Sequence, residues 1–208
     1  MSEGAEIVEF LRRIFERRSV HPPASITGIL GSSRKDGNTR VLTDAVLRHL
    51  NDAQLIDLSD LTIAPYDYDH ADTRDDFLPL AEMMAQSTAI IFASPVYWYS
   101  MSAQMKVFFD RLTDLTKTHK ALGRSLAGKT AYLVATGADK TPAPSFEAPF
   151  AETAGYFGMH WGGMLHQSFN SDRRMTSQMD EHAAAFAEKI KTSFQAADTM
   201  SKQGPLAA

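Results

Sequence analysis

The chain has 208 residues, 44% of them hydrophobic and 22% charged, which is enough apolar material for one compact domain with a full core. The formal net charge is −4 without a basic stripe, so nucleic acid is not expected as a partner. Cysteine is absent, which excludes disulfides, thiol nucleophiles, cysteine-ligated zinc and iron–sulfur clusters. The sequence shows neither a signal-peptide pattern nor an apolar stretch of membrane length, so we predict a cytoplasmic protein without a membrane partner.

The first predicted element is an amphipathic helix at residues 3–18, where apolar side chains recur at helical spacing. Its four acidic and four basic side chains balance, which favours packing against the domain or a second subunit over a membrane surface. The run His21-Pro22-Pro23 ends this helix. We therefore predict a helical extension at 1–22, a main domain at 23–196 and a flexible tail at 197–208.

Strands and helices alternate through the main domain. Strands are expected at 25–31, 53–58, 89–93, 131–135 and 164–169. Helices are expected at 39–50, 78–86, 102–118, 145–157 and 177–194, with Pro149 tolerable only near the first turn of its helix. This alternation predicts a doubly wound parallel sheet in an α/β fold. Ligands of such sheets bind at the carboxyl ends of the strands, so the loops after strands one, three and four are the candidates for a site.

The loop after the first strand has the composition of a phosphate cradle. It reads GSSRKDGNTR over residues 31–40 and leads directly into a helix. Small residues allow close backbone approach to an anion, hydroxyls donate to phosphate oxygens, and Arg34 adds positive charge. The N-terminus of the following helix adds unpaired N–H groups and the positive end of its dipole. The alternative is an ordinary polar loop between a strand and a helix.

The loop after the third strand reads SPVYWYSM over residues 94–101 and carries three consecutive aromatic residues. All three cannot point into the core, so at least one faces a ligand or a partner; a subunit contact and a core cluster are the alternatives. A planar heterocycle is the natural occupant beside these rings. The loop after the fourth strand, residues 136–142, has Gly137 and small neighbours that permit close backbone approach to a ligand. It either supplies a third wall of the site or is a plain loop.

These segments together resemble the flavodoxin-like NAD(P)H-dependent FMN reductase family over about residues 25–169. The resemblance rests on GSSR…GNTR and on the more specific SPVYWYSMSAQMK…FDR. It implies a five-stranded sheet of order 2-1-3-4-5 that holds FMN at its switch point. It implies phosphate binding by Ser32, Arg34, Asn38 and Thr39. It further implies that the isoalloxazine ring is bordered by Pro95, Val96, Tyr97, Trp98, Tyr99, Ser100, Thr136 and Gly137.

Three other motifs carry no site in this interpretation. Residues 123–130 match the P-loop pattern G-x-x-x-x-G-K-T, but they follow a predicted helix and run into a strand, which is the wrong context for phosphate binding. The seven histidines show no H-x-x-x-H spacing, so no metal site is expected. The acidic loop at 62–77 lacks the glycine and terminal glutamate of a calcium loop and is expected to form a solvated rim or a mobile lid.

The resemblance implies an FMN-dependent oxidoreductase that takes a hydride from NADPH or NADH and passes electrons to a flavin, quinone or similar small acceptor by ping-pong kinetics. The flavin carries the chemistry, so no catalytic side chain is assigned. The sequence does not decide between NADH and NADPH. A homodimer or a dimer of dimers is expected because exposed aromatics lie beside the site. A one-electron carrier on the same fold and a non-catalytic flavin-binding protein remain the alternatives.

Overall fold

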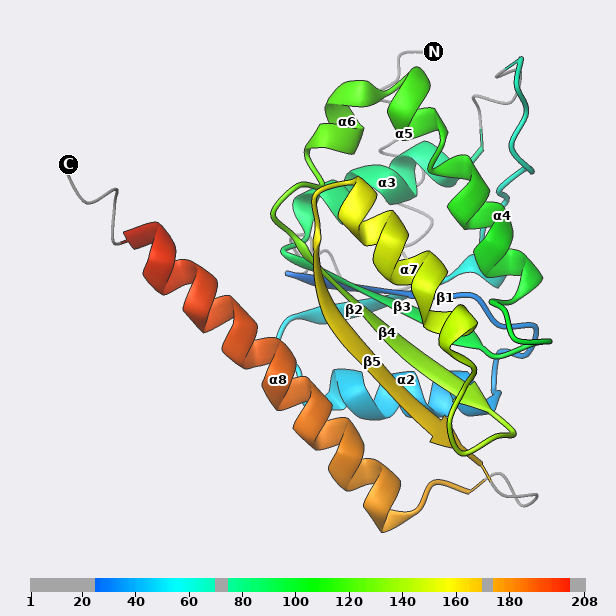
Figure 1. Cartoon of the computed structure of the whole chain (residues 1–208), viewed down its shortest axis with the longest axis vertical. Helices are drawn as coiled ribbons and strands as arrows, with labels where there is room; N and C mark the ends of the chain where they lie inside the picture. Colours follow the sequence, from blue (N-terminus) through cyan, green and yellow to red (C-terminus); the bar gives the residue numbers. More distant parts are fainter. Residues whose placement is uncertain (1–24, 70–74, 170–173, 203–208) are drawn as a thin grey trace.

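The fold is a parallel sheet with helices on both faces, seen in a computed structural model that describes residues 25–69, 75–169 and 174–202 (Figure 1). Only the backbone of residues 194–202 is described. The five strands lie in the order β2-β1-β3-β4-β5 and all pair in parallel, which confirms the predicted sheet. The helix predicted at 3–18 and residues 203–208 lie outside the described part of the chain.

The elements follow one another in a regular alternation. The strands are β1 (Ile26–Leu30), β2 (Ala53–Asp57), β3 (Ala89–Pro95), β4 (Thr130–Gly137) and β5 (His160–Ser168). The helices are α2 (Asn38–Arg48), the 3-10 turn η1 (Leu58–Asp60), α3 (Phe77–Gln86), α4 (Ala103–Arg111), α5 (Asp114–Lys117), α6 (Lys120–Arg124), α7 (Pro144–Tyr156) and α8 (Ser177–Lys202).

The sheet separates two hydrophobic cores. One core lies under α3, α4 and α7 and contains six phenylalanines in ring contact, namely Phe77, Phe92, Phe108, Phe109, Phe146 and Phe150. The other lies under α2 and α8 on the opposite face (Figure 1). Every residue of the central strand β3 is buried, as expected for a strand covered on both faces.

Two predicted helices differ from those observed. The helix expected at 102–118 is interrupted after Arg111, so α4 and α5 are separate, and the short helix α6 that follows was not predicted. Helix α6 folds back on α5 so closely that a Cβ on Gly123 would overlap the carbonyl of Leu115, so glycine is needed at this position. Pro149 lies inside α7, where the buried rings of Phe146 and Phe150 anchor the helix despite the missing N–H.

The last two elements are longer than predicted. Strand β5 begins at His160 instead of residue 164, with an irregular register opposite Ala131 and Tyr132. This extension requires Gly162, because a Cβ there would overlap the Tyr132 ring, and Gly163, whose φ is +98°. Neither glycine suggests a strand from sequence alone. Helix α8 ends at Lys202 instead of residue 194.

Residues 123–130, which match the P-loop pattern, lie in a structural context that excludes phosphate binding by a P-loop. The first of these residues belong to α6 and the last begins β4, so no helix follows the glycine-rich turn. Lys129 donates from Nζ to the carbonyls of Ala85 at 2.7 Å and Ser87 at 2.5 Å, at the C-terminal end of α3. Burial lowers the pKa of this lysine. Lys129 therefore caps a helix instead of binding phosphate.

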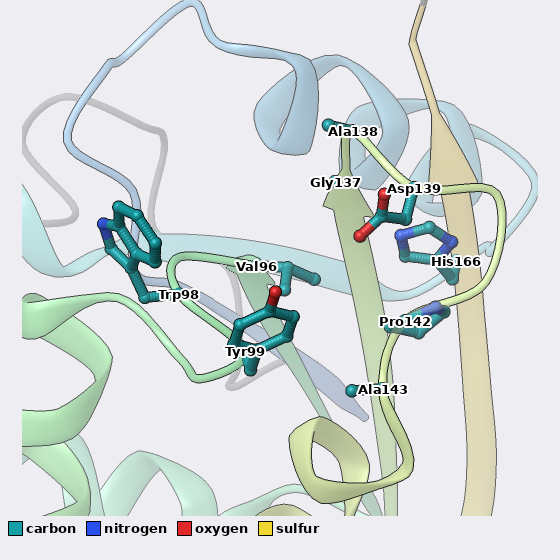
Figure 2. A pocket seen from close by; sticks show the side chains of 9 residues that line it. All are labelled: Val96, Trp98, Tyr99, Gly137, Ala138, Asp139, Pro142, Ala143 and His166. Carbon is teal, nitrogen blue, oxygen red and sulfur yellow. The ribbon is translucent and has the colours of Figure 1, made fainter.

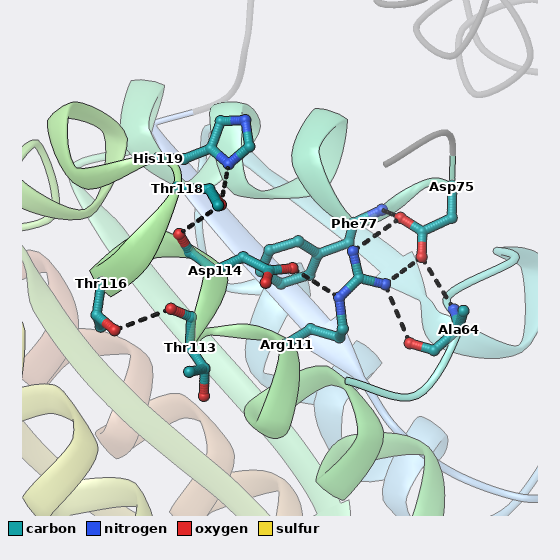
Figure 3. A network of polar contacts seen from close by, with 9 residues as sticks. All are labelled: Ala64, Asp75, Phe77, Arg111, Thr113, Asp114, Thr116, Thr118 and His119. Atoms are coloured by element: carbon teal, nitrogen blue, oxygen red, sulfur yellow. Dashed lines mark hydrogen bonds and ion pairs between the residues drawn. The ribbon is translucent and has the colours of Figure 1, made fainter. Parts of the chain in front are cut away.

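A buried arginine ties the acidic loop to the helical layer (Figure 3). The Arg111 side chain, 4% exposed, forms ion pairs with Asp75 and with Asp114, the latter at 2.8 Å. It also donates to the Ala64 carbonyl at 3.0 Å and lies 4.8 Å from the centre of the Phe77 ring. Burial alone would lower the pKa of Arg111, but hydrogen bonds and charges from the two aspartates outweigh it and raise the pKa.

We predict that Arg111→Met lowers the free energy of unfolding by about 3–5 kcal/mol, because it leaves two buried carboxylates without their cation. Urea unfolding followed by circular dichroism measures the loss. The matched control is Lys106→Met on the same helix, whose exposed pair with Asp110 stabilises by less than about 1 kcal/mol. Equal losses for the two variants would contradict the structural role given to Arg111.

Candidate functional site

The carboxyl ends of β1, β3 and β4 meet at one edge of the sheet, as the parallel register requires. Leu30 lies opposite Ala93, and Pro95 lies opposite Thr136. The Gly31 amide extends the pairing by donating to the Ala93 carbonyl at 2.9 Å. The three loops that follow these strands are thereby neighbours, although more than a hundred residues separate the first from the last.

Ser102 fastens the first of these loops to the start of α4. Its hydroxyl donates to the Gly31 carbonyl at 2.7 Å and accepts from the Met105 amide at 3.2 Å as the helix cap. A Cβ on Gly31 would lie 2.9 Å from the Met105 amide nitrogen, so glycine is needed for this close approach. Ser94 joins the same arrangement by accepting from the Ser102 amide at 3.0 Å.

The N-terminus of α2 opens onto this edge without a side-chain cap. Gly37 occupies the cap position and no side chain there accepts a hydrogen bond from the first turn. The Ser32 hydroxyl is 5% exposed and lies 3.4 Å from the Arg34 amide, while the Arg34 side chain is exposed and Asn38 half-buried. An uncapped helix N-terminus beside hydroxyls and a guanidinium can bind an anion.

One hydrogen bond joins this loop to the end of β4. The hydroxyl groups of Thr39 and Thr136, both buried, lie 2.7 Å apart. Thr39 is therefore held by Thr136 in this structure, and its place among the predicted phosphate ligands stays a prediction. The contact fixes the start of α2 against the end of the sheet.

The aromatic loop forms a tight turn with a strained backbone. Tyr97 and Ser100 exchange two backbone hydrogen bonds of 2.9 and 3.0 Å. Between them, Trp98 and Tyr99 have φ angles of +49° and +64°, the left-handed pattern of a type I′ turn that favours asparagine and glycine. Trp98 is 93% exposed and Tyr99 62% exposed. The turn therefore holds two large rings outward at the edge of the sheet.

A pocket of about 210 Å³ opens between this turn and the loop after β4 (Figure 2). Four of the residues assigned to the ring site line it: Val96, Trp98, Tyr99 and Gly137. The other four have different environments, because Pro95 and Thr136 are buried within strands and Tyr97 and Ser100 form the base of the turn. The sequence-based assignment of these residues to a flavin ring stays a prediction.

The remaining lining residues are Ala138, Asp139, Pro142, Ala143 and His166. The first three belong to the loop at 136–142 that was predicted as a possible third wall, whereas Ala143 and His166 were not singled out from the sequence. His166 comes from β5, a strand whose end we did not expect to reach the site. Burial lowers the pKa of His166, although the Lys140 backbone and the negative charge of Asp139 favour its protonated form. A sequence signal did exist, since His166 is a polar residue on the same face of the strand as Met164, which packs against the core.

We predict that Tyr99→Gly raises the free energy of unfolding by roughly 0.5–1 kcal/mol. Glycine removes a left-handed cost of about 1–2 kcal/mol, which exceeds its added flexibility in the unfolded chain of about 0.5–1 kcal/mol. The control Tyr99→Ala removes the ring but keeps the strain, so it should give no gain. Urea unfolding of both variants measures the difference, and a loss of stability in Tyr99→Gly would show that the ring itself holds the turn.

Comparison with known proteins shows a family match and two similar flavin proteins. The profile of the family described as NADPH-dependent FMN reductase matches residues 24–160. An NAD(P)H-dependent FMN-containing oxidoreductase of Bacillus subtilis, YwqN, is 33% identical over 122 residues, covering 55% of this chain and 67% of that protein. An iron–sulfur flavoprotein of Archaeoglobus fulgidus is 34% identical over 96 residues, covering 41% of this chain and only 44% of that protein.

Solved structures agree with the fold. The Trp repressor binding protein of Bacillus subtilis has a TM-score of 0.62 and 26% identity, covering 77% of this chain and 96% of that one. The general stress protein 14 of Treponema denticola, in complex with FMN, has a TM-score of 0.59 at 15% identity, covering 82% and 99%. The latter identity supports the fold alone.

The fold and the family match define a flavodoxin-like flavoprotein. The chain belongs to the NADPH-dependent FMN reductase family, and it is an oxidoreductase that uses FMN and NAD(P)H. The likeness to iron–sulfur flavoproteins does not extend to a cysteine-ligated cluster, because this chain has no cysteine. Within its described part, no helix is long and apolar enough to cross a bilayer, and no group of three or more potential metal ligands occurs.

Proposed function

We propose that the chain binds FMN with its phosphate at the start of α2 and its ring at the pocket, and that it passes electrons from NAD(P)H to a small flavin, quinone or similar acceptor by ping-pong kinetics. The observation that carries this proposal is the arrangement at one edge of the sheet. An uncapped helix N-terminus and an aromatic-walled pocket lie there together, joined by the hydrogen bond between Thr39 and Thr136.

The residues present fit a flat ligand with an anionic end. Ser32, Arg34 and the first turn of α2 supply hydroxyl, guanidinium and amide donors for the phosphate. Val96 and Gly137 supply an apolar wall for the ring, and Tyr99 supplies an aromatic one. Bound FMN supplies the hydride chemistry, while the chain positions it and sets its electrostatic surroundings.

The small size of the pocket supports a mechanism in which the electron donor and the acceptor bind in turn at the same face of the flavin ring. A cavity of about 210 Å³ is smaller than the roughly 300 Å³ at which ligand pockets begin, so it encloses only part of a three-ring system. The rest of the ring stays open to a second flat molecule, beside the exposed Trp98. Sequential access of donor and acceptor to one open face is the physical basis of ping-pong kinetics.

The test of the function is a spectrum of the chain loaded with FMN, desalted, and mixed without oxygen with NADPH or NADH. We expect retained flavin that bleaches directly to the two-electron form with one of the two donors. Initial rates at varied donor and acceptor should then give parallel double-reciprocal lines. A stable one-electron form, or flavin that ignores both donors, would instead support a carrier or a non-catalytic flavin-binding protein.

The phosphate assignment makes a separate prediction. Arg34→Ala should weaken FMN binding by about 1.5–3 kcal/mol, because it removes a charge-assisted hydrogen bond to the phosphate. Fluorescence titration of FMN measures the change. The matched control is Lys35→Ala, the next residue, whose side chain pairs with Asp60; it should cost less than about 1 kcal/mol. Equal effects of the two variants would place the phosphate elsewhere.

We also propose that the chain forms a homodimer or a dimer of dimers. The support is the exposure of Trp98 and Tyr99 at the mouth of the pocket, where a second copy would cover them. Light scattering of the FMN-loaded chain reports the assembly, and a monomer would contradict it. A cytoplasmic location stays a prediction from the sequence.

A further inference from the structure

His166 is a half-buried side chain whose two ring nitrogens are shielded from solvent. The Lys140 backbone lies close enough to favour the protonated ring, but neither nitrogen forms a well-aligned hydrogen bond within the described residues. Buried polar atoms are nearly always paired, since an unpaired one costs about 1–3 kcal/mol. An incompletely paired imidazole in a pocket wall is a candidate for contact with a ligand. His166 also lies beyond residues 24–160, so the family match itself assigns nothing to it.

The imidazole lies in the wall of the pocket, packed against the ends of β3 and β4. A Cβ built on Gly137 would lie 3.2 Å from His166 Nε2 and 3.3 Å from Val96 Cβ, so Nε2 faces the wall formed by the ends of β3 and β4. Figure 2 shows the ring beside Asp139 on one side of the pocket, with Tyr99 across from it. A flat ligand between these two sides would bring its edge to the imidazole.

The groups around His166 allow the protonation of its ring to change with the charge of a ligand in the pocket. Asp139 and the Lys140 backbone face it from the loop after β4, and both favour the protonated ring. The next residue, Gln167, points to the other face of the sheet, where it bonds His182 of α8 at 2.8 Å. Of the residues that line the pocket, His166 is the one whose side chain can gain a positive charge near neutral pH.

We propose that His166 takes up a proton from solvent when the flavin ring in this pocket is reduced, and releases it on reoxidation. The inference rests on the proposed function. A hydride from NAD(P)H brings two electrons and one proton and leaves the ring with one added negative charge. Protonation of the imidazole, which burial otherwise disfavours by lowering its pKa, restores the charge balance of the pocket. Electrons leaving for the acceptor reverse the charge, and the proton departs.

The experiment is a spectroscopic titration of the midpoint potential of the FMN-loaded chain between pH 6 and 9. The wild-type chain should take up two protons per two electrons over part of this range, one on the reduced flavin ring and one on His166. His166→Gln, which keeps a polar side chain of similar size, should take up one. The slopes then differ by about 30 mV per pH unit for a two-electron couple.

Two further variants isolate the cause. His49→Gln is the matched control, because His49 at the end of α2 also has a buried, unpaired Nε2 but does not line the pocket; it should keep the wild-type slope. Asp139→Asn removes the carboxylate that favours the imidazolium, so the steep region should end at a lower pH. This variant tests the proposal independently if His166→Gln fails to fold.

The outcomes separate this inference from the function on which it rests. A one-proton slope for the wild-type chain, or a wild-type slope for His166→Gln, overturns the role of His166 and leaves FMN binding intact. A chain that retains no FMN overturns the proposed function and this inference with it. A steep slope that is lost only in His166→Gln, and shifted in Asp139→Asn, supports the proposal.

Discussion

The site depends on the point where the winding of the sheet reverses between β1 and β3. The chain leaves β1 toward α2 on one face and leaves β3 toward α4 on the other, so the two loops diverge and a crevice opens between them. The parallel register brings the end of β4 to the same edge. Everything proposed to bind ligand lies in or beside this crevice, where the loops after β1, β3 and β4 meet.

Short polar contacts turn that crevice into a defined site. Ser102 joins the first loop to α4, and Thr39 joins the start of α2 to the end of β4. Both contacts are buried, so each hydroxyl that lost its partner would be left without water to replace it. The Arg111 network holds the acidic loop in the same way on the helical layer. The ligand-facing groups are thus positioned before any ligand arrives, which lowers the entropy that binding must overcome.

Two features of the site contradict local structural preference, and both face the pocket. Trp98 and Tyr99 occupy left-handed backbone where glycine or asparagine is favoured, and the shielded ring nitrogens of His166 form no well-aligned hydrogen bond within the described residues. Strain and unpaired polar groups persist when the rest of the fold determines them, and they gather where ligands bind. The turn presents aromatic surface at the mouth, while the imidazole presents a titratable group at the wall. Their positions on opposite sides of one cavity suit a flat ring whose charge changes during the reaction.

The sequence by itself determined the parallel α/β class, the central buried strand and the loops that form the site, since these follow from hydrophobic period and from motifs of neighbouring residues. The sheet order came only through the family resemblance that those motifs carry. It also excluded the P-loop match at 123–130 through its context. Only the tertiary structure decided the break after Arg111, the extension of β5 and the place of His166. The extension depends on close packing of Gly162 against the Tyr132 ring of the neighbouring strand, and the return of α6 onto α5 depends on close packing of Gly123 against Leu115. His166 reaches the pocket because β5 pairs with β4, which places His166 opposite Ala135 near the end of β4. The residues around His166 in the sequence do not specify which loop its strand will lie beside.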